Sequence, residues 1–183
     1  NQSRIHQFDM SDKDNCMYSP DVISFAREKG YFDGVNKDFS FAKAYAPLDF
    51  GARRYCEARV WSYFNMFTAR GNEFLPYILG DTDTPMPLFV KPDRKISVQD
   101  VKNAMRDHYE GTPLDISKDF GAGPYHTPYR LSPLSFKVGD KEYFNERPIS
   151  TQQSGFVFVA QMRSTLPDAI GGVLWFGTDD ANM

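Results

Sequence analysis

The sequence predicts an α+β protein, with helices in its first part and an antiparallel sheet in its last. Three observations lead to this fold class. Apolar residues recur at helical spacing over residues 52–70, a helix-capping pattern opens residues 97–109, and two apolar strand-like runs occupy residues 155–162 and 170–176.

The first predicted helix follows Ser19-Pro20-Asp21 and ends at Gly30. Ser19 is a suitable N-cap, Pro20 suits the first helical position, and glycine commonly closes a helix C-terminus. The sequence therefore predicts a short helix over residues 20–30.

The helix over residues 52–70 has one apolar and one basic face. Arg53, Arg54 and Arg59 form the basic face, which we expect to be solvated, as such faces usually are. The apolar face is made by residues at helical spacing, namely Tyr55, Cys56, Val60, Trp61, Phe64 and Phe67.

The third helix begins at Ser97, which with Asp100 resembles a capping box. We expect it to run to residue 109 and to end before Gly111. Five of its residues fall on one face, which is apolar except for the histidine at its end: Val98, Val101, Ala104, Met105 and His108.

The last part of the chain is predicted to form strands. Residues 136–144 read as a hairpin with a tight turn at Gly139-Asp140. The runs over 155–162 and 170–176 show little alternation, which indicates a sheet covered on at least one face. Asp81 and Asp83, in a proline-rich loop, are interpreted as a plain turn rather than a metal loop.

Composition limits the function classes. A chain of 183 residues with 25% charged residues is expected to form a single domain over 1–183. Its net charge of -3 argues against a protein that binds nucleic acid. The sequence contains no apolar run of about 18 residues, so we expect no transmembrane helix and no membrane partner. Because it starts at Asn1 and stops at Met183, soon after a strand, we expect a fragment of a longer protein. No signal peptide is visible, so bacterial cytoplasm and export both stay open.

Metal and cofactor chemistry finds no support in the sequence. His6, His108 and His126 form no HxH or HxxxH pair, and phosphate-binding loops and GxSxG are absent. We therefore expect neither a metal nor a cofactor. Cys16 and Cys56 are 40 positions apart, and two free buried thiols are favoured over a disulfide.

Two arginines are the better candidates for ligand contacts. Arg147 precedes Pro148, so its backbone is held extended, and a strand-mounted guanidinium can bind a carboxylate through two hydrogen bonds. Arg163 stands at the far end of what we interpret as the same strand. Salt bridges at the rim of the sheet are the alternative interpretation for both.

Several segments resemble the PepD-like cysteine dipeptidases, a family of N-terminal-nucleophile hydrolases. HYEGTPLD over residues 108–115 and RPI over 147–149 are the most specific of them. The others are NQSRIHQFD at the start, ARVW in the long helix, KIS before the third helix, and GGVLWFG near the end. The resemblance extends along nearly the whole chain.

The resemblance implies an αββα sandwich of antiparallel sheets with flanking helices, and hydrolysis of dipeptides with a free N-terminus. Its nucleophile is an N-terminal cysteine whose own α-amine acts as the base. This chain departs from that pattern, because residue 1 is asparagine and neither cysteine lies in the family's nucleophile segment. We expect that segment upstream and further chain downstream, so that this polypeptide alone is inactive.

The resemblance also suggests roles for individual residues. Asn1 is a candidate oxyanion donor, and Arg147 is expected to face either the substrate carboxylate or the catalytic thiolate. Arg163, His108 and Asp115 are further candidates for substrate binding, although His108 and Asp115 also fit purely structural roles. The expected partners are a dipeptide and the rest of the parent polypeptide, and a homo-oligomer stays open.

A non-catalytic α+β module that binds peptide or sugar is the alternative function. Its support is the aromatic content of 15% and the proline-rich loop.

Overall fold

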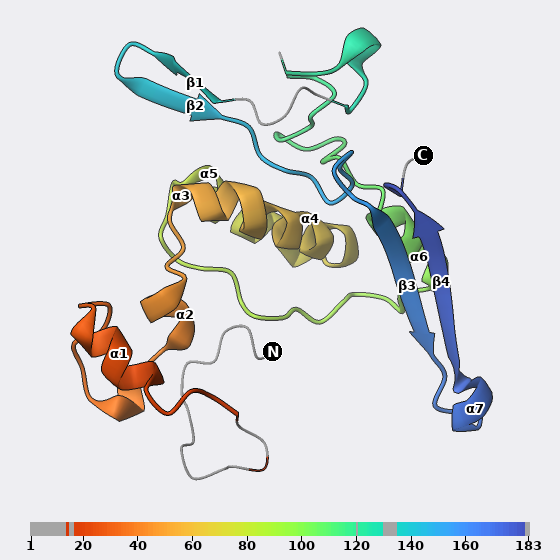
Figure 1. Cartoon of the computed structure of the whole chain (residues 1–183). Coiled ribbons are helices and arrows are strands. Elements are labelled where there is room, and N and C mark those ends of the chain that lie inside the picture. Colours follow the sequence, from red (N-terminus) through yellow and green to blue (C-terminus); the bar gives the residue numbers. More distant parts are fainter. Residues whose placement is uncertain (1–13, 15–16, 120, 130–134, 182–183) are drawn as a thin grey trace. The chain divides into compact units, whose positions relative to one another are not determined.

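The computed structural model describes residue 14 and residues 17–119, 121–129 and 135–181 (Figure 1). The chain divides into two compact units, Asn1–Phe50 and Gly51–Met183. The single domain expected over 1–183 stays a prediction. In the described ranges, every helix is too short or too polar to cross a membrane.

The first unit is a small helical cluster. It contains α1 (Val22–Glu28), the 3-10 turn η2 (Asn36–Asp38) and α2 (Phe41–Tyr45). The predicted helix is thus present, although its N-cap is Asp21 instead of Ser19. Gly30 ends it as predicted, at a φ of 72°. The buried core consists of Val22, Ile23, Ala26, Phe39 and Ala44.

The second unit contains the remaining elements, and α3 (Phe50–Ala52) lies at its start. Its helical elements are the π-helical turn η3 (Arg53–Glu57), α4 (Ala58–Phe67), the 3-10 turn η4 (Ala69–Phe74), α5 (Leu75–Leu79), α6 (Val98–Ala104), the 3-10 turn η5 (Pro124–His126) and α7 (Asp168–Gly171). The core packs mainly around α4 and α5, with Ala58, Trp61, Tyr77, Ile78, Met86, Tyr109, Leu114 and Ile116.

The predicted long helix is present, but the π turn divides it. The Ala58 N–H bonds to the Arg53 carbonyl, five residues back, which inserts one residue into the turn. Positions before the insertion lose the 3.6-residue register of α4. The prediction of a buried Cys56 is therefore wrong, because this free cysteine is exposed. Cys16 lies outside the described residues.

The prediction of a solvated basic face is also wrong. The side chains of Arg53 and Arg54 are only 12% and 15% exposed and each pairs with a carboxylate. The Arg59 Nε is buried as well.

The helix α6 has the predicted start and an earlier end. Ser97 and Asp100 form a complete capping box. The helix ends at Ala104, so His108 does not lie on it as predicted. The His108 N–H donates to the Glu110 side chain at 2.7 Å and not to a helical carbonyl, which takes the backbone out of the helix.

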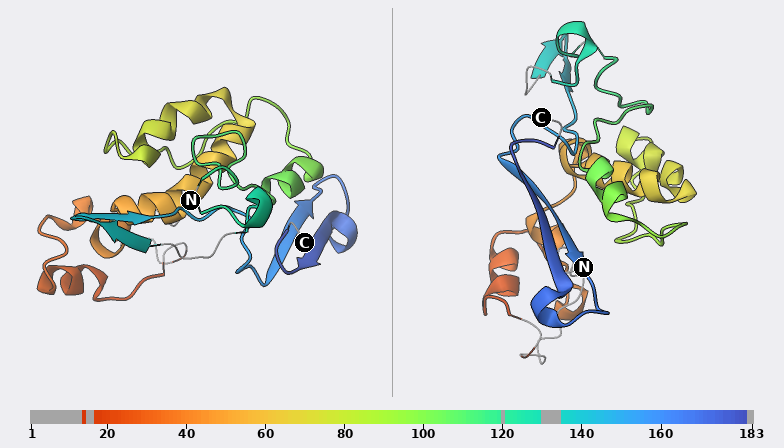
Figure 2. Two further views of the ribbon diagram at one scale, coloured as in Figure 1. Left: turned by 90° about the horizontal axis from the view of Figure 1, so that it is seen from above. Right: turned by 90° about the vertical axis from the view of Figure 1, so that its right-hand side faces the viewer.

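Two antiparallel hairpins confirm the α+β class. In the first, β1 (Ser135–Val138) pairs with β2 (Lys141–Phe144) across the predicted turn, where Gly139 has a φ of 58°. In the second, β3 (Phe156–Met162) pairs with β4 (Gly172–Thr178), and the two lie side by side in both further views (Figure 2). Each sheet has two strands within the described residues.

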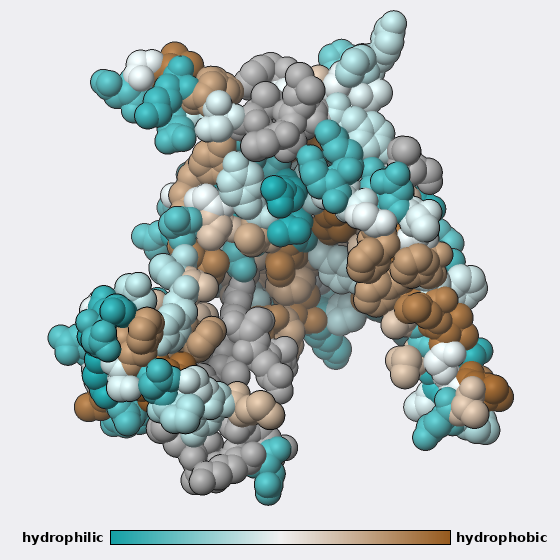
Figure 3. Space-filling model, viewed as in Figure 1, coloured by the Kyte–Doolittle hydropathy of each residue, from teal (hydrophilic) through white to brown (hydrophobic). Residues whose placement is uncertain are grey.

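One face of the second hairpin packs toward α6, which agrees with the expected coverage on at least one face, and its other face is exposed. The surface along β3 and β4 is hydrophobic (Figure 3). Phe156, Phe158, Leu174 and Phe176 are all more than half exposed. The α6 helix contacts β3, and Lys102 lies 3.7 Å from the Trp175 ring centroid.

Gly71 provides a stability test, because its backbone lies against α4. A Cβ here would lie 2.2 Å from the Asn65 Cα, and the Gly71 carbonyl accepts the Trp61 indole N–H at 3.0 Å. We expect Gly71→Ala to lower the free energy of unfolding of the full-length protein by about 1–3 kcal/mol, measured by urea denaturation. Gly155→Ala is the control, since nothing lies within 4 Å of its Cβ. Equal stabilities would contradict this packing.

Candidate functional site

A turn over residues 107–110 forms the centre of the candidate site. Asp107, His108 and Tyr109 are buried one after another, and Tyr109 is fully buried. Tyr109 has a φ of 65°, which is unfavourable for a bulky residue and costs on the order of 1–3 kcal/mol. Such strained positions cluster at functional sites, which favours a functional role for this turn.

Tyr109 connects the turn to two other segments. Its ring stacks on Trp61 of α4, with centroids 6.5 Å apart. Its hydroxyl donates to the Arg147 carbonyl at 2.6 Å. Burial raises the pKa of Tyr109, and the nearby Glu146 charge adds to this effect, so the phenol stays a neutral donor.

Arg147 therefore has a fixed backbone and an exposed side chain. Pro148 after it is buried. The guanidinium carbon lies 5.9 Å from the Tyr55 ring centroid, and Tyr55 stacks on Phe144 at 5.2 Å. The prediction that Arg147 is mounted on a strand is wrong, because it lies in the loop between β2 and β3.

Glu146, next to Arg147, forms the most buried ion pair of the described residues. Its carboxylate lies 2.8 Å from the Arg54 guanidinium, with side chains 7% and 15% exposed. Removing one partner of such a pair leaves a buried charge and typically costs about 3–5 kcal/mol. The pair thus anchors the Arg147 loop on η3.

Arg163 is not brought together with Arg147. It follows β3, a strand of seven residues that spans about 23 Å. Its side chain donates to the backbone carbonyls of Ile170 at 2.7 Å and Gly171 at 3.3 Å. These bonds hold the turn at α7, and a role in substrate binding stays a prediction.

Asp115 is held by internal donors. Its carboxylate accepts the Gly111 N–H at 3.0 Å, the Ser117 hydroxyl at 2.6 Å and the Ser117 N–H at 3.1 Å. Lys118 lies 3.1 Å away. Burial raises the pKa of Asp115, but these hydrogen bonds outweigh it and lower the pKa to about 2. Its predicted substrate contact stays a prediction.

His108 has one satisfied ring nitrogen. Its Nδ1 lies 3.0 Å from Glu110, while its Nε2 is buried and has no hydrogen-bond partner among the described residues. The ring packs edge-on against Tyr129. Asn1 lies outside the described residues, so its role as oxyanion donor also stays a prediction.

Sequence reasoning missed Asp107, which directly precedes the HYEGTPLD segment. The Ser62 hydroxyl donates to its carboxylate at 2.7 Å, and its carbonyl accepts the Ser150 N–H at 3.0 Å. Burial raises the pKa of Asp107. The sequence signal was an aspartate beside an apolar helix face, which alone does not indicate burial. In the part of the chain that the structure describes, no group of three or more metal-ligating side chains gathers.

Comparison with known proteins assigns the family. The sequence matches the profile of peptidase family C69 over residues 1–183. The chain belongs to peptidase family C69. This confirms the resemblance to cysteine dipeptidases that the motifs indicated.

Several curated relatives of the C69 chain are named dipeptidases. A probable dipeptidase of Salmonella dublin is 34% identical over 94% of this chain and 34% of its own length. A probable dipeptidase of Latilactobacillus sakei is 28% identical over 97% of this chain and 32% of its own length. Dipeptidase A of Lactobacillus helveticus is 25% identical over all of this chain and 34% of its length.

The C69 chain thus spans about a third of the length of these relatives. No solved structure gives a significant match.

The lowered pKa of Asp115 predicts a pH effect on stability. An acid whose pKa is lowered by folding stabilises the fold above its unfolded pKa, 3.8, and this contribution is lost as pH falls toward about 2. The free energy of unfolding of the full-length protein should therefore decrease between pH 4 and about 2, and it should decrease less in Asp115→Asn than in the wild type. Parallel curves for wild type and Asp115→Asn in urea titrations would contradict this assignment.

Proposed function

We propose that the protein is a cysteine dipeptidase, which hydrolyses dipeptides with a free N-terminus through a cysteine at the N-terminus of its mature chain. The observation that carries this proposal is the match to peptidase family C69 along the whole chain, with relatives named dipeptidases. It favours the enzyme over a non-catalytic peptide- or sugar-binding module.

The proposed nucleophile lies outside this chain. An N-terminal cysteine carries both the thiol and the α-amine that removes its proton, so covalent bonds fix their geometry. The thiolate attacks the peptide carbonyl, the C-terminal amino acid leaves, and water hydrolyses the thioester. Cys56 does not suit this role, because its own nitrogen belongs to the peptide bond with Tyr55 on η3 and cannot act as the base. In the part of the chain that the structure describes, no hydrogen bond or ion pair involves its thiol either.

Two residues of this chain are proposed to support that reaction. Asn1 is proposed as an amide donor to the tetrahedral oxyanion, which would contribute roughly 3 kcal/mol. Arg147 is proposed to face a negative charge at the reaction centre, either the substrate carboxylate or the thiolate. The anchored backbone and exposed guanidinium of Arg147 support this second assignment.

The full-length protein, purified after any processing, tests the function. Free amino acids released from a panel of dipeptides would be measured by amine-specific chromatography. We expect turnover, abolished by iodoacetamide and unchanged by dialysis against a chelator. Activity lost to the chelator and restored by zinc or manganese would overturn the thiol mechanism.

Arg147→Lys in the full-length enzyme tests the second residue. Lysine keeps the charge but loses the paired hydrogen-bond geometry, so we expect kcat/KM to fall about tenfold or more, which is roughly 1.4 kcal/mol of transition-state stabilisation. The unfolding midpoint should change little, because the side chain is exposed. Arg163→Lys is the control and should affect kcat/KM less. Wild-type kinetics with lowered stability would mark Arg147 as structural.

A further inference from the structure

A cavity of about 500 Å³ opens between the end of α4 and α6. Its volume lies within the range of about 300–1,000 Å³ found for small-molecule sites. Met66 and Phe67 of α4 and Ala104 of α6 form its apolar wall, and its charged wall contains Arg94, Asp100, Arg106, Asp107 and Glu110.

Two of these five charges cancel each other. Arg94 binds Asp100 through two hydrogen bonds of 2.8 and 2.9 Å, and Asp100 also caps α6. Their charges are therefore neutralised within the protein. Arg106, Asp107 and Glu110 remain to face a ligand.

Asp107 and Glu110 form the negative side of the cavity. Asp107 is only 7% exposed, and its carboxylate accepts a hydrogen bond from the neutral Ser62 hydroxyl. Among the described residues, no lysine or arginine forms an ion pair with Asp107, and the neighbouring His108 lies against Glu110. A buried carboxylate in this position is costly, and a ligand ammonium group would offset that cost. Glu110 is held in place, since its two oxygens lie against the His108 N–H and Nδ1.

Arg106 forms the positive side. Its Nε donates to the Ala181 carbonyl at 2.7 Å, which orients the guanidinium. The residue is exposed and no acidic side chain of the described residues pairs with it. Its terminal amino groups are placed to bind a carboxylate.

We infer that this cavity binds both charged ends of a dipeptide, with Asp107 and Glu110 facing the α-ammonium group and Arg106 facing the α-carboxylate. The inference rests on the proposed dipeptidase function and adds how the substrate is recognised. Met66 and Phe67 then face a substrate side chain. Arg147 was proposed to face either the substrate carboxylate or the thiolate. Because Arg106 binds the carboxylate in this arrangement, Arg147 is assigned to the thiolate.

The test uses the full-length enzyme and three substrates: a dipeptide, its N-acetyl analogue and its C-terminal amide. We expect Asp107→Asn and Glu110→Gln to raise KM for the free dipeptide about tenfold, with kcat changed less than about threefold, because each removes a charge that binds the ground state and transition state alike. The preference for free over N-acetyl dipeptide should shrink by a similar factor. Arg106→Gln should shrink the preference for the free dipeptide over the amide.

Lys102→Gln is the matched control. This lysine is also on α6 but lies over Trp175 and does not line the cavity, so both preferences should be unchanged. Unfolding midpoints show whether Asp107→Asn is destabilised. If it is, Glu110→Gln alone tests the binding of the ammonium group, because the Glu110 side chain is 58% exposed and its replacement should leave the fold intact.

The outcomes separate the two proposals. A wild-type enzyme that cleaves no dipeptide overturns the proposed function and this inference with it. An active enzyme whose folded variants keep the wild-type KM and both preferences overturns the cavity assignment alone.

Discussion

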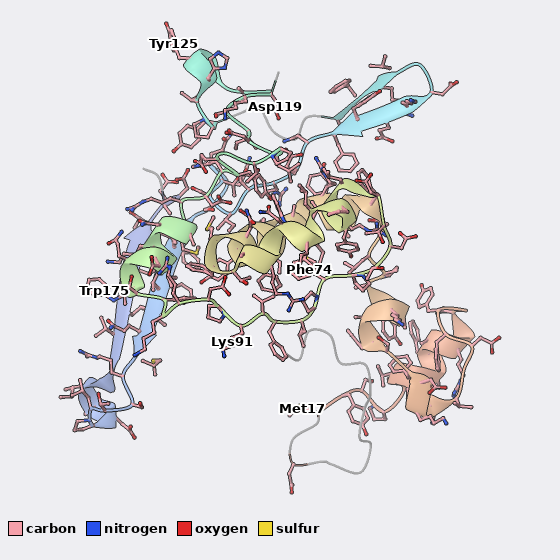
Figure 4. All side chains as sticks on the ribbon, turned by 180° about the vertical axis from the view of Figure 1, so that it is seen from behind. Met17, Phe74, Lys91, Asp119, Tyr125 and Trp175 are labelled. Atoms are coloured by element: carbon pink, nitrogen blue, oxygen red, sulfur yellow. The ribbon has the colours of Figure 1, made fainter. Side chains whose placement is uncertain are left out.

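The fully buried Tyr109 holds the second unit together, in a backbone conformation that favours glycine. Full burial of a large side chain contributes about 1.5–3 kcal/mol, which is comparable to the strain of about 1–3 kcal/mol at its positive φ. The balance therefore depends on the stacking with Trp61 and the hydrogen bond to the Arg147 carbonyl. Because these contacts join α4, the turn after α6 and the loop before β3, the site and the core share one point of attachment. Elsewhere in the same unit, Trp175 of β4 lies beside α6 (Figure 4).

Features that depend on adjacent residues could be predicted from the sequence. The capping box at Ser97, the turn at Gly139 and the helix end at Gly30 each need only three or four neighbouring positions. The ion pair of Arg54 with Glu146 joins residues 92 positions apart, and no local pattern could select this partner among the acidic residues. The same limit explains the basic face, since an arginine is solvated or buried according to what distant chain lies over it. The prediction that Cys56 is buried failed for another reason, because the single residue inserted at the π turn shifts an otherwise valid helical pattern.

In the second hairpin, the strands and the coverage of at least one face were predicted, but the partner of each face was not. Its strands and pairing follow from the apolar runs, but coverage requires partners that the pattern does not identify. One face packs toward α6, while the other presents Phe156, Phe158, Leu174 and Phe176. Exposed apolar patches are uncommon on proteins in water and often mark contact surfaces. The sandwich implied by the family would stack a second sheet on such a face, about 10 Å away.

Two aspartates near the turn illustrate how environment separates residues of one type. Asp115 belongs to the recognisable HYEGTPLD segment, but donors from Gly111, Ser117 and Lys118 satisfy its carboxylate and lower its pKa. Asp107, just before that segment, is buried with weaker support, and its pKa is raised. A carboxylate already satisfied by its own protein has little left to offer a ligand, whereas one that burial destabilises gains most when a cation arrives. Sequence reasoning selected Asp115 because it lies in the motif. The physical argument selects Asp107, because the number of donors around a carboxylate is a property of the folded chain.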